Sequence, residues 1–198
     1  MAIPALQQHS GEHLADGNVR GSIIHAHMRW VRDYVSREQM IELFETLPTR
    51  TRRQVSMLLM SSWYPFATLI EVDRTIVALF GQGNSQILEQ LGAYSADMDL
   101  AGPYAVLRPE GVSGFLRRAS QLHREFQDFG SAAFEEDGAH AGTMVHSGYT
   151  SYSPLFCISA DGFYRRSVTL HQVTDVQVTE TECQCKGDPA CRFRITWR

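Results

Sequence analysis

The spacing of apolar residues changes along the chain, and this change limits the possible folds more than any other feature. Between residues 36 and 126, apolar side chains recur every three or four positions, which is typical of amphipathic helices. After residue 131, apolar and polar residues alternate around turn signals, as in antiparallel strands. No repeat or linker divides the chain, so the sequence predicts a single α+β domain. In it, a bundle of N-terminal helices packs on a small antiparallel sheet with a C-terminal helix–hairpin unit.

The helices and strands can be placed approximately. Ser36 and Gln39 form a capping-box pattern at the start of a helix that ends before Pro48. Further helices are expected at residues 49–60, 62–80, about 85–98 and 111–126, with residues 23–31 as one more candidate. In the second half, strands are expected at residues 131–136 and 143–149, a helix at 153–170, and a hairpin of residues 173–183 and 191–197.

Residues 1–20 are expected to form a flexible tail before a ligand-binding domain at residues 21–198. The tail has neither the basic start nor the apolar run of a secretory signal, which indicates a cytoplasmic protein. The most apolar region, residues 55–80, is interrupted by proline and charged residues, so no membrane span is expected. With 18 Lys and Arg against 22 Asp and Glu and no basic stripe, direct nucleic-acid binding is not expected either.

All four cysteines lie late in the chain, at Cys157, Cys183, Cys185 and Cys191. In a reducing compartment, such clustering favours a metal site or a reactive thiol over disulfides. If the hairpin pairs symmetrically about its turn, Cys183 and Cys191 face each other, and Glu180 lies three residues before Cys183. Together with Cys157 in the first turn of the preceding helix, they suit a tetrahedral zinc site. Three sulfurs and one carboxylate leave no position for a reactive water, so the zinc would be structural.

Other interpretations of these residues stay open. Cys183 and Cys191 could form a cross-strand disulfide, and Cys157 could be a small buried apolar residue. Glu180 could be a solvated strand residue. Cys185 could replace Cys183 as a ligand, because the two cysteines are only two positions apart.

The stretch from Glu180 to Phe193, with Cys157 at a helix start, resembles the C-terminal signature of the 4-vinyl reductase small-molecule-binding domain. That domain is also the sensory module of phenol- and hydrocarbon-responsive bacterial transcription activators. In those sensors a zinc is held by a Cys, a Glu and two further Cys, with two residues between the Glu and the next Cys and seven between the last pair. The resemblance therefore implies Cys157, Glu180, Cys183 and Cys191 as zinc ligands, and favours Cys183 over Cys185.

A weaker resemblance extends over residues 21–197. This region, including Trp63 to Phe66 and Phe129-Gly130, looks like an uncharacterised paralogous group that is numerous in myxobacteria. The wider superfamily is similar to heme nitric-oxide-binding domains and to vesicle-tethering subunits that hold an acyl chain in a tunnel. The resemblance implies helices packed on a small antiparallel sheet, an internal apolar pocket and often a dimer.

Heme and catalysis are not expected. The heme nitric-oxide family uses a Tyr-x-Ser-x-Arg signature to hold the heme propionates, and the segment Tyr149 to Ser153 lacks the arginine. No Ser/His/Asp, Cys/His or paired-carboxylate arrangement stands out, so no catalytic residues are predicted. An enzyme acting on a hydrophobic substrate remains a third interpretation, because one branch of the resembled family is associated with chlorophyll-precursor reduction.

The leading hypothesis is a cytoplasmic, non-enzymatic sensory or ligand-binding domain for an apolar small molecule or acyl chain, with a structural zinc. Binding would act on a homodimer or on a protein partner that the sequence does not identify. Aromatic residues are expected to line the pocket, namely Trp63, Phe66, Phe115, Phe126, Tyr149 and Phe163, although each could equally belong to an ordinary core. The alternative is a docking or scaffold module of the same fold with a filled pocket.

Overall fold

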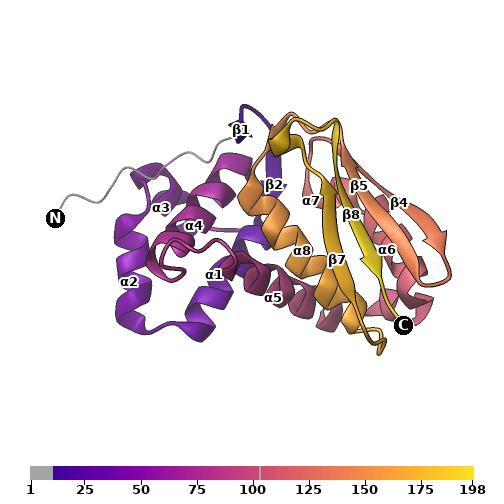
Figure 1. Ribbon diagram of the computed structural model, residues 1–198. Coiled ribbons are helices and arrows are strands. Elements are labelled where there is room, and N and C mark those ends of the chain that lie inside the picture. Colours follow the sequence, from indigo (N-terminus) through magenta and orange to yellow (C-terminus); the bar gives the residue numbers. More distant parts are fainter. Residues whose placement is uncertain (1–10, 103) are drawn as a thin grey trace.

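The N-terminal helices occupy one side of the molecule, and a four-stranded sheet with further helices against it occupies the other (Figure 1). The structure is a computed structural model, and it describes residues 11–102 and 104–198. The expected α+β architecture, with N-terminal helices packed on a small antiparallel sheet, is confirmed. Among the described residues, no helix is both long enough and apolar enough to cross a membrane.

Five helices form the first half. They are α1 (Gly21–Tyr34), α2 (Arg37–Thr46), α3 (Thr49–Ser56), α4 (Phe66–Leu79) and α5 (Ile87–Ala101). The predicted capping box is present, because Ser36 Oγ accepts from the Gln39 amide at 3.2 Å and Gln39 Oε1 accepts from the Ser36 amide at 3.0 Å. Helix α4 is buried on most sides and forms the centre of the helical core.

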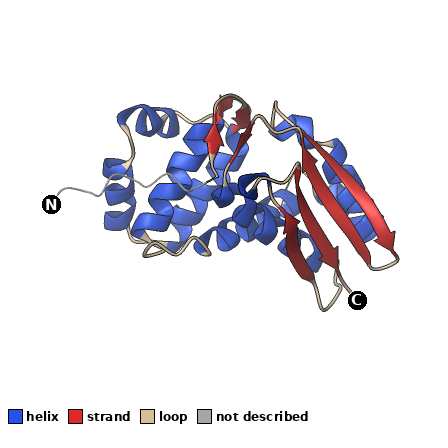
Figure 2. Ribbon diagram, turned by 45° about the horizontal axis from the view of Figure 1, so that its top comes forward, coloured by secondary structure: helices blue, strands red, loops and turns tan. Residues whose placement is uncertain are grey.

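The second half contains the sheet and the helices that cover it. Its elements are η1 (Ala105–Glu110), α6 (Gly111–Gln121), α7 (His123–Phe126), β4 (Ser131–Gly138), β5 (Ala141–Ser147), α8 (Pro154–Thr169), β7 (Gln177–Glu182), η2 (Gln184–Lys186) and β8 (Ala190–Thr196). The antiparallel strands lie in the order β4-β5-β8-β7. Helices α6 and α8 pack against them, and Figure 2 shows the helices behind the red sheet. Helix α8 starts as predicted, with Ser153 as its N-cap and Pro154 in its first turn.

Two short strand pairs differ from the sequence-based expectation. Residues 11–20 were expected to belong to the tail, but β1 (His13–Leu14) pairs with β6 (Ser151–Tyr152) and β2 (Asn18–Arg20) pairs with β3 (Trp63–Pro65). Residues 1–10 of that tail lie outside the described residues. The helix expected from residue 62 begins only at Phe66, because Trp63 to Pro65 are extended and pair with β2.

The segment before α1 crosses from the helical side to the start of α8. The imidazole Nδ1 of His13 is hydrogen-bonded to the carbonyl oxygen of Thr150 at 2.8 Å. Glu12 contacts the guanidinium of Arg74 on α4 and accepts a hydrogen bond from the Ser153 hydroxyl at 2.5 Å. This segment therefore ties α4 to the first turn of α8.

The core has two parts that meet at α5 and α8. One lies among α1 to α4 and the other lies between α6, α8 and the sheet. Helices α5 and α8 approach very closely at two glycines. A Cβ atom added at Gly92 would overlap the carbonyl oxygen of Ser159, and one added at Gly162 would overlap the carbonyl oxygen of Glu89. The glycine inside α8 is therefore explained by close backbone packing.

Candidate functional site

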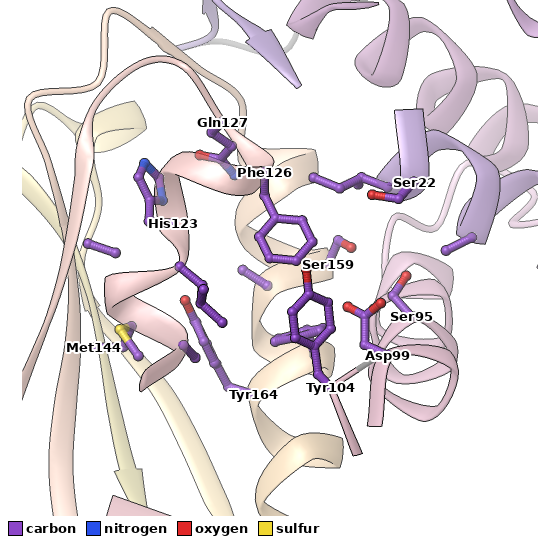
Figure 3. A pocket seen from close by; sticks show the side chains of 18 of the residues that line it. Ser22, Ser95, Asp99, Tyr104, His123, Phe126, Gln127, Met144, Ser159 and Tyr164 are labelled. Atoms are coloured by element: carbon purple, nitrogen blue, oxygen red, sulfur yellow. The ribbon is translucent and has the colours of Figure 1, made fainter. Parts of the chain in front are cut away.

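A cavity of about 160 Å³ lies between the two parts of the core (Figure 3). Helices α1, α5 and α8 form one side of it, and α6, α7 and the inner face of β4 and β5 form the other. Its apolar lining consists of Ile23, Ala26, Leu100, Phe115, Ala119, Leu122, Phe126, Ala132, Met144, Phe156, Ala160 and Phe163. An apolar cavity of roughly 150 Å³ can bind benzene, so this one has room for a single ring.

The structure brings only half of the predicted aromatic residues to this cavity. Phe115, Phe126 and Phe163 line it. The other three are not among its described lining residues and have other environments. Trp63 is 39% exposed in β3 with the Arg20 guanidinium 4.0 Å above its ring, whereas Phe66 and Tyr149 pack in the helical core around Phe129. The sequence shows aromatic character but not which side of a helix or strand faces the cavity.

A chain of polar side chains reaches the cavity from the helical side. His27 on α1 is hydrogen-bonded through Nδ1 to Oδ1 of Asp73 on α4 at 2.6 Å, and its Nε2 lies 3.4 Å from Ser159 Oγ on α8. His27 and Asp73 are essentially fully buried, at 1% and 0% exposure. Both His27 and Ser159 line the cavity. The sequence analysis missed this Ser–His–Asp arrangement, because its members lie on three helices with no characteristic spacing.

A second polar group lies between the cavity and the sheet. His146 Nε2 is hydrogen-bonded to the Tyr164 hydroxyl at 2.5 Å, and His123 Nε2 is hydrogen-bonded to the Phe129 carbonyl oxygen at 3.0 Å. Burial lowers the pKa of His146 to about 3 and also lowers the pKa of His123, so both imidazoles are neutral at pH 7. These histidines were not predicted as site residues.

The cysteine cluster lies where the first turn of α8 meets the hairpin of β7 and β8, within the core part between α6, α8 and the sheet. Cys157 Sγ is 3.8 Å from Cys183 Sγ and 3.9 Å from Cys191 Sγ. One ligand atom from each of Cys157, Glu180, Cys183 and Cys191 lies within 4.8 Å of the others. In a tetrahedral site with Zn–S bonds of about 2.3 Å, two sulfurs lie about 3.8 Å apart. The structure thus brings the four predicted residues together at distances that suit a single metal ion.

The surroundings favour a thiolate at Cys183, whereas the hydrogen bond to Cys183 raises the pKa of Cys157 and the neighbours of Cys191 together raise its pKa. The Cys191 sulfur accepts a hydrogen bond from the Gln184 amide at 3.3 Å, and the Asp188 carboxylate holds the Cys183 amide at 2.8 Å. Hydrogen bonding from the Cys157 thiol lowers the pKa of Cys183. Burial raises the pKa of Glu180 to about 7, and its Oε1 is buried without a hydrogen-bond partner among the described residues. A buried carboxylate oxygen without a partner is what a metal ion would satisfy.

Cys185 differs from the other three cysteines. It lies in the short η2 turn and is partly exposed, whereas Cys157, Cys183 and Cys191 are buried. It is outside the group of four residues whose ligand atoms converge. All four cysteines are free thiols, so the alternative of a disulfide between Cys183 and Cys191 is not what the structure shows.

No protein-family model and no curated protein sequence matches this chain. Solved structures do match it. An H-NOX protein from S. oneidensis in the Fe(II)NO ligation state aligns with a TM-score of 0.70 and 13% sequence identity, over 90% of this chain and 99% of that chain. The chain has the H-NOX fold. At this identity the likeness concerns the fold alone.

Further H-NOX structures give the same result. One, determined to probe the function of heme distortion in the H-NOX family, aligns with a TM-score of 0.70, 12% identity and coverage of 90% and 95%. Another, an oxygen-binding H-NOX domain related to soluble guanylate cyclases in its oxygen complex, has a TM-score of 0.68, 12% identity and the same coverage. These neighbours contradict the prediction that heme is excluded. One absent arginine is a local difference, whereas the H-NOX fold is shared over most of the chain.

Proposed function

We propose that this chain is a non-enzymatic sensory domain that binds a small apolar ligand in the cavity between its two core parts. The observation that carries the proposal is the apolar cavity itself, enclosed by three helices on one side and by helices and strands on the other. The likeness to H-NOX structures supports a sensory role, because ligand complexes are described for proteins of that fold.

Helix α8 offers a path from the cavity to the rest of the molecule. Its first turn carries Cys157 of the cysteine cluster, and its next turns carry Ala160 and Phe163 of the cavity wall. A ligand that displaces this wall would therefore also shift the cluster and the strands attached to it. An output through a homodimer or a protein partner would use such a shift.

We further propose that Cys157, Glu180, Cys183 and Cys191 bind a thiolate-preferring metal ion, as the resemblance to the 4-vinyl reductase domain implies. The sulfur–sulfur distances and the unpartnered Glu180 Oε1 support this. With all four ligands from protein, the ion would hold the hairpin to α8 and leave no site for a reactive water.

The metal proposal is tested with a pair of cysteine variants. Cys183→Ser should lose bound zinc, whereas Cys185→Ser should keep one zinc per chain, measured by elemental analysis of the purified proteins. Cobalt substitution of the wild-type protein should give the visible spectrum of a tetrahedral thiolate site. The assignment is wrong if the wild-type protein holds no zinc after zinc loading, or if Cys185→Ser loses it as well.

Heme is a second candidate ligand, because H-NOX structures with this fold contain it. His123 supplies an imidazole in the cavity wall, and aromatic rings supply apolar contacts. The cavity of about 160 Å³, however, has the size of one ring and not of a porphyrin, and no described residue that lines it is a Lys or Arg that could pair with heme carboxylates. The residues therefore fit heme only in part, and the porphyrin would require α6 and α7 to move away from α5. When bound, heme supplies an iron centre for a gaseous ligand.

The ligand proposal is tested by titrating the protein with toluene and, separately, with hemin. Toluene should bind saturably, and Ala119→Leu, which fills the cavity from α6, should weaken binding at least tenfold. Ala93→Leu, on α5 outside the lining, should change it less than threefold. Saturable hemin binding that is lost in His123→Ala but kept in His140→Ala would identify heme as the ligand. If neither compound binds, toluene and heme are excluded as ligands, and the docking module replaces the sensory proposal if benzylamine and benzyl alcohol also fail to bind.

A further inference from the structure

The wall of the cavity carries acidic groups without matching basic ones. Its lining includes the carboxylate of Asp99 and the imidazole of His27, behind which lies the carboxylate of Asp73. Among the described residues that line the cavity, none is a lysine or arginine. Even a protonated His27 would balance only one of the two carboxylates. Buried charge is costly unless an opposite charge lies close to it.

Asp99 is the acidic group that a ligand can reach. It lies in the last turn of α5, and Figure 3 shows its carboxylate beside Ser95 and Tyr104 at the edge of the cavity. No described residue donates a hydrogen bond or forms an ion pair with this carboxylate. Burial raises the pKa of Asp99 to about 6, so the group is charged at pH 7 despite an unfavourable environment.

The serine beside Asp99 offers a ligand only lone pairs. The hydroxyl hydrogen of Ser95 is donated to the Leu91 carbonyl oxygen at 2.9 Å, so Ser95 Oγ has only acceptor capacity left for a ligand. Both ring nitrogens of His27 already have neighbours, because Nδ1 is hydrogen-bonded to Asp73 and Nε2 lies 3.4 Å from Ser159 Oγ. A ligand that supplies hydrogen-bond donors and positive charge would satisfy this wall.

We infer that the ligand of this cavity is a small arylalkylamine such as benzylamine, whose ammonium group pairs with Asp99 and whose ring lies among Phe115, Phe126 and Phe163. The inference rests on the proposed function, because it names the head group of the ligand that the sensory domain would bind. The size of the cavity limits the body of the ligand to about one ring. The absence of basic lining residues disfavours a carboxylic acid of the same shape.

Three compounds of nearly equal size separate the contribution of the head group from that of the ring. Benzylamine, benzyl alcohol and benzoate are titrated calorimetrically into the wild-type protein at pH 7.5. Benzylamine should bind at least tenfold more tightly than benzyl alcohol, and benzoate should bind most weakly. Asp99→Asn should weaken benzylamine at least tenfold and leave benzyl alcohol within threefold.

Asp97→Asn is the matched control. Asp97 lies two residues away on the same helix, and its carboxylate accepts from Arg166 Nε at 2.8 Å on the surface. This variant should keep the wild-type preference for the amine. If benzyl alcohol binds as tightly as benzylamine to the wild-type protein, the amine inference is overturned while the cavity remains a ligand site. If none of the three binds, the proposed function fails together with the inference.

Discussion

Asp73 has no exposed surface and its only hydrogen-bonded partner among the described residues is His27, through one carboxylate oxygen. Replacing it by alanine leaves the imidazole Nδ1 of His27 buried without its hydrogen-bond partner, which costs about 1–3 kcal/mol. We expect Asp73→Ala to lower the free energy of unfolding by that amount in urea denaturation. Asp161→Ala, which removes a surface pair with Arg165, should cost less than about 1 kcal/mol. Equal losses in the two variants would contradict the role of the buried pair.

Asp99 should make stability depend on pH in an unusual direction. Its pKa rises from 3.8 to about 6 on folding, so the folded state holds this proton more tightly than the unfolded state. Asp99 makes its full contribution to the free energy of unfolding below about pH 4. This contribution, up to about 3 kcal/mol, is lost as the pH rises toward 6. Asp99→Asn should therefore be more stable than the wild type at pH 7 and equal to it near pH 4. Denaturation curves at both pH values measure this, and a variant less stable at pH 7 would refute it.

Contacts between individual side chains can be predicted from the sequence where the residues are close together along the chain or share a known spacing. Cys183 and Cys191 could be placed opposite each other because one hairpin contains both. His27, Asp73 and Ser159 lie on three helices, and nothing in their spacing along the chain brings them together. The raised pKa of Asp99 likewise comes from burial beside a cavity, and no local sequence pattern predicts that burial.

Among the elements, α5 and α8 depend most on close contact. Gly92→Ala would place a methyl group against the backbone of α8, and backbone atoms cannot turn away as a side chain can. Overpacking of this kind typically costs about 1–3 kcal/mol. We expect that loss for Gly92→Ala in thermal or urea unfolding. Gly114→Ala on α6 is the control, because its added Cβ atom would lie 2.8 Å from the Cβ of the exposed Glu110 and not against another helix. It should cost less than Gly92→Ala, and an equal loss would contradict this explanation.

Helices with local start and stop signals were predictable, and short pairings were not. The Ser36 capping box and the Ser153-Pro154 start both appear as expected, since each depends on a few neighbouring residues. Strand β3 was predicted as helix, because its extended form depends on hydrogen bonds to β2, more than 40 residues earlier in the chain. The break between α6 and α7 at Leu122 also went unpredicted, since the apolar spacing continues through it.

In the whole molecule, the cysteine cluster belongs to one core part and not to the other. Cys157, Cys183 and Cys191 pack with residues of α6, α8 and the sheet, whereas α1 to α4 form a separate apolar cluster. Metal binding should therefore stabilise the sheet side selectively. After removal of the metal by a chelator, hydrogen exchange should rise in β7, β8 and the first turn of α8. Exchange in α1 and α4 should stay nearly unchanged, and a uniform increase would show that the two cores unfold as one unit.

The overall architecture could be predicted from the change in apolar spacing, because that pattern reports which faces are buried. The cavity could not, since it lies where α1, α5, α6 and the sheet fail to fill the space between them. Such a gap depends on side-chain volumes from many elements at once. For the same reason only three of the six expected aromatic residues reach it.

The pairing of β1 with β6, just before α8, also affects the order of folding during synthesis. His13 is bonded to Thr150, a residue 137 positions later. At a synthesis rate of 5–20 residues per second, roughly 7–30 s pass between the emergence of the two partners from the ribosome. The helices α1 to α4 are complete well before then, so they must form while the segment around His13 is still unpaired. Closing this long loop is then a late event in folding, and a nascent chain stalled before residue 150 should remain open to proteases at its N-terminal segment.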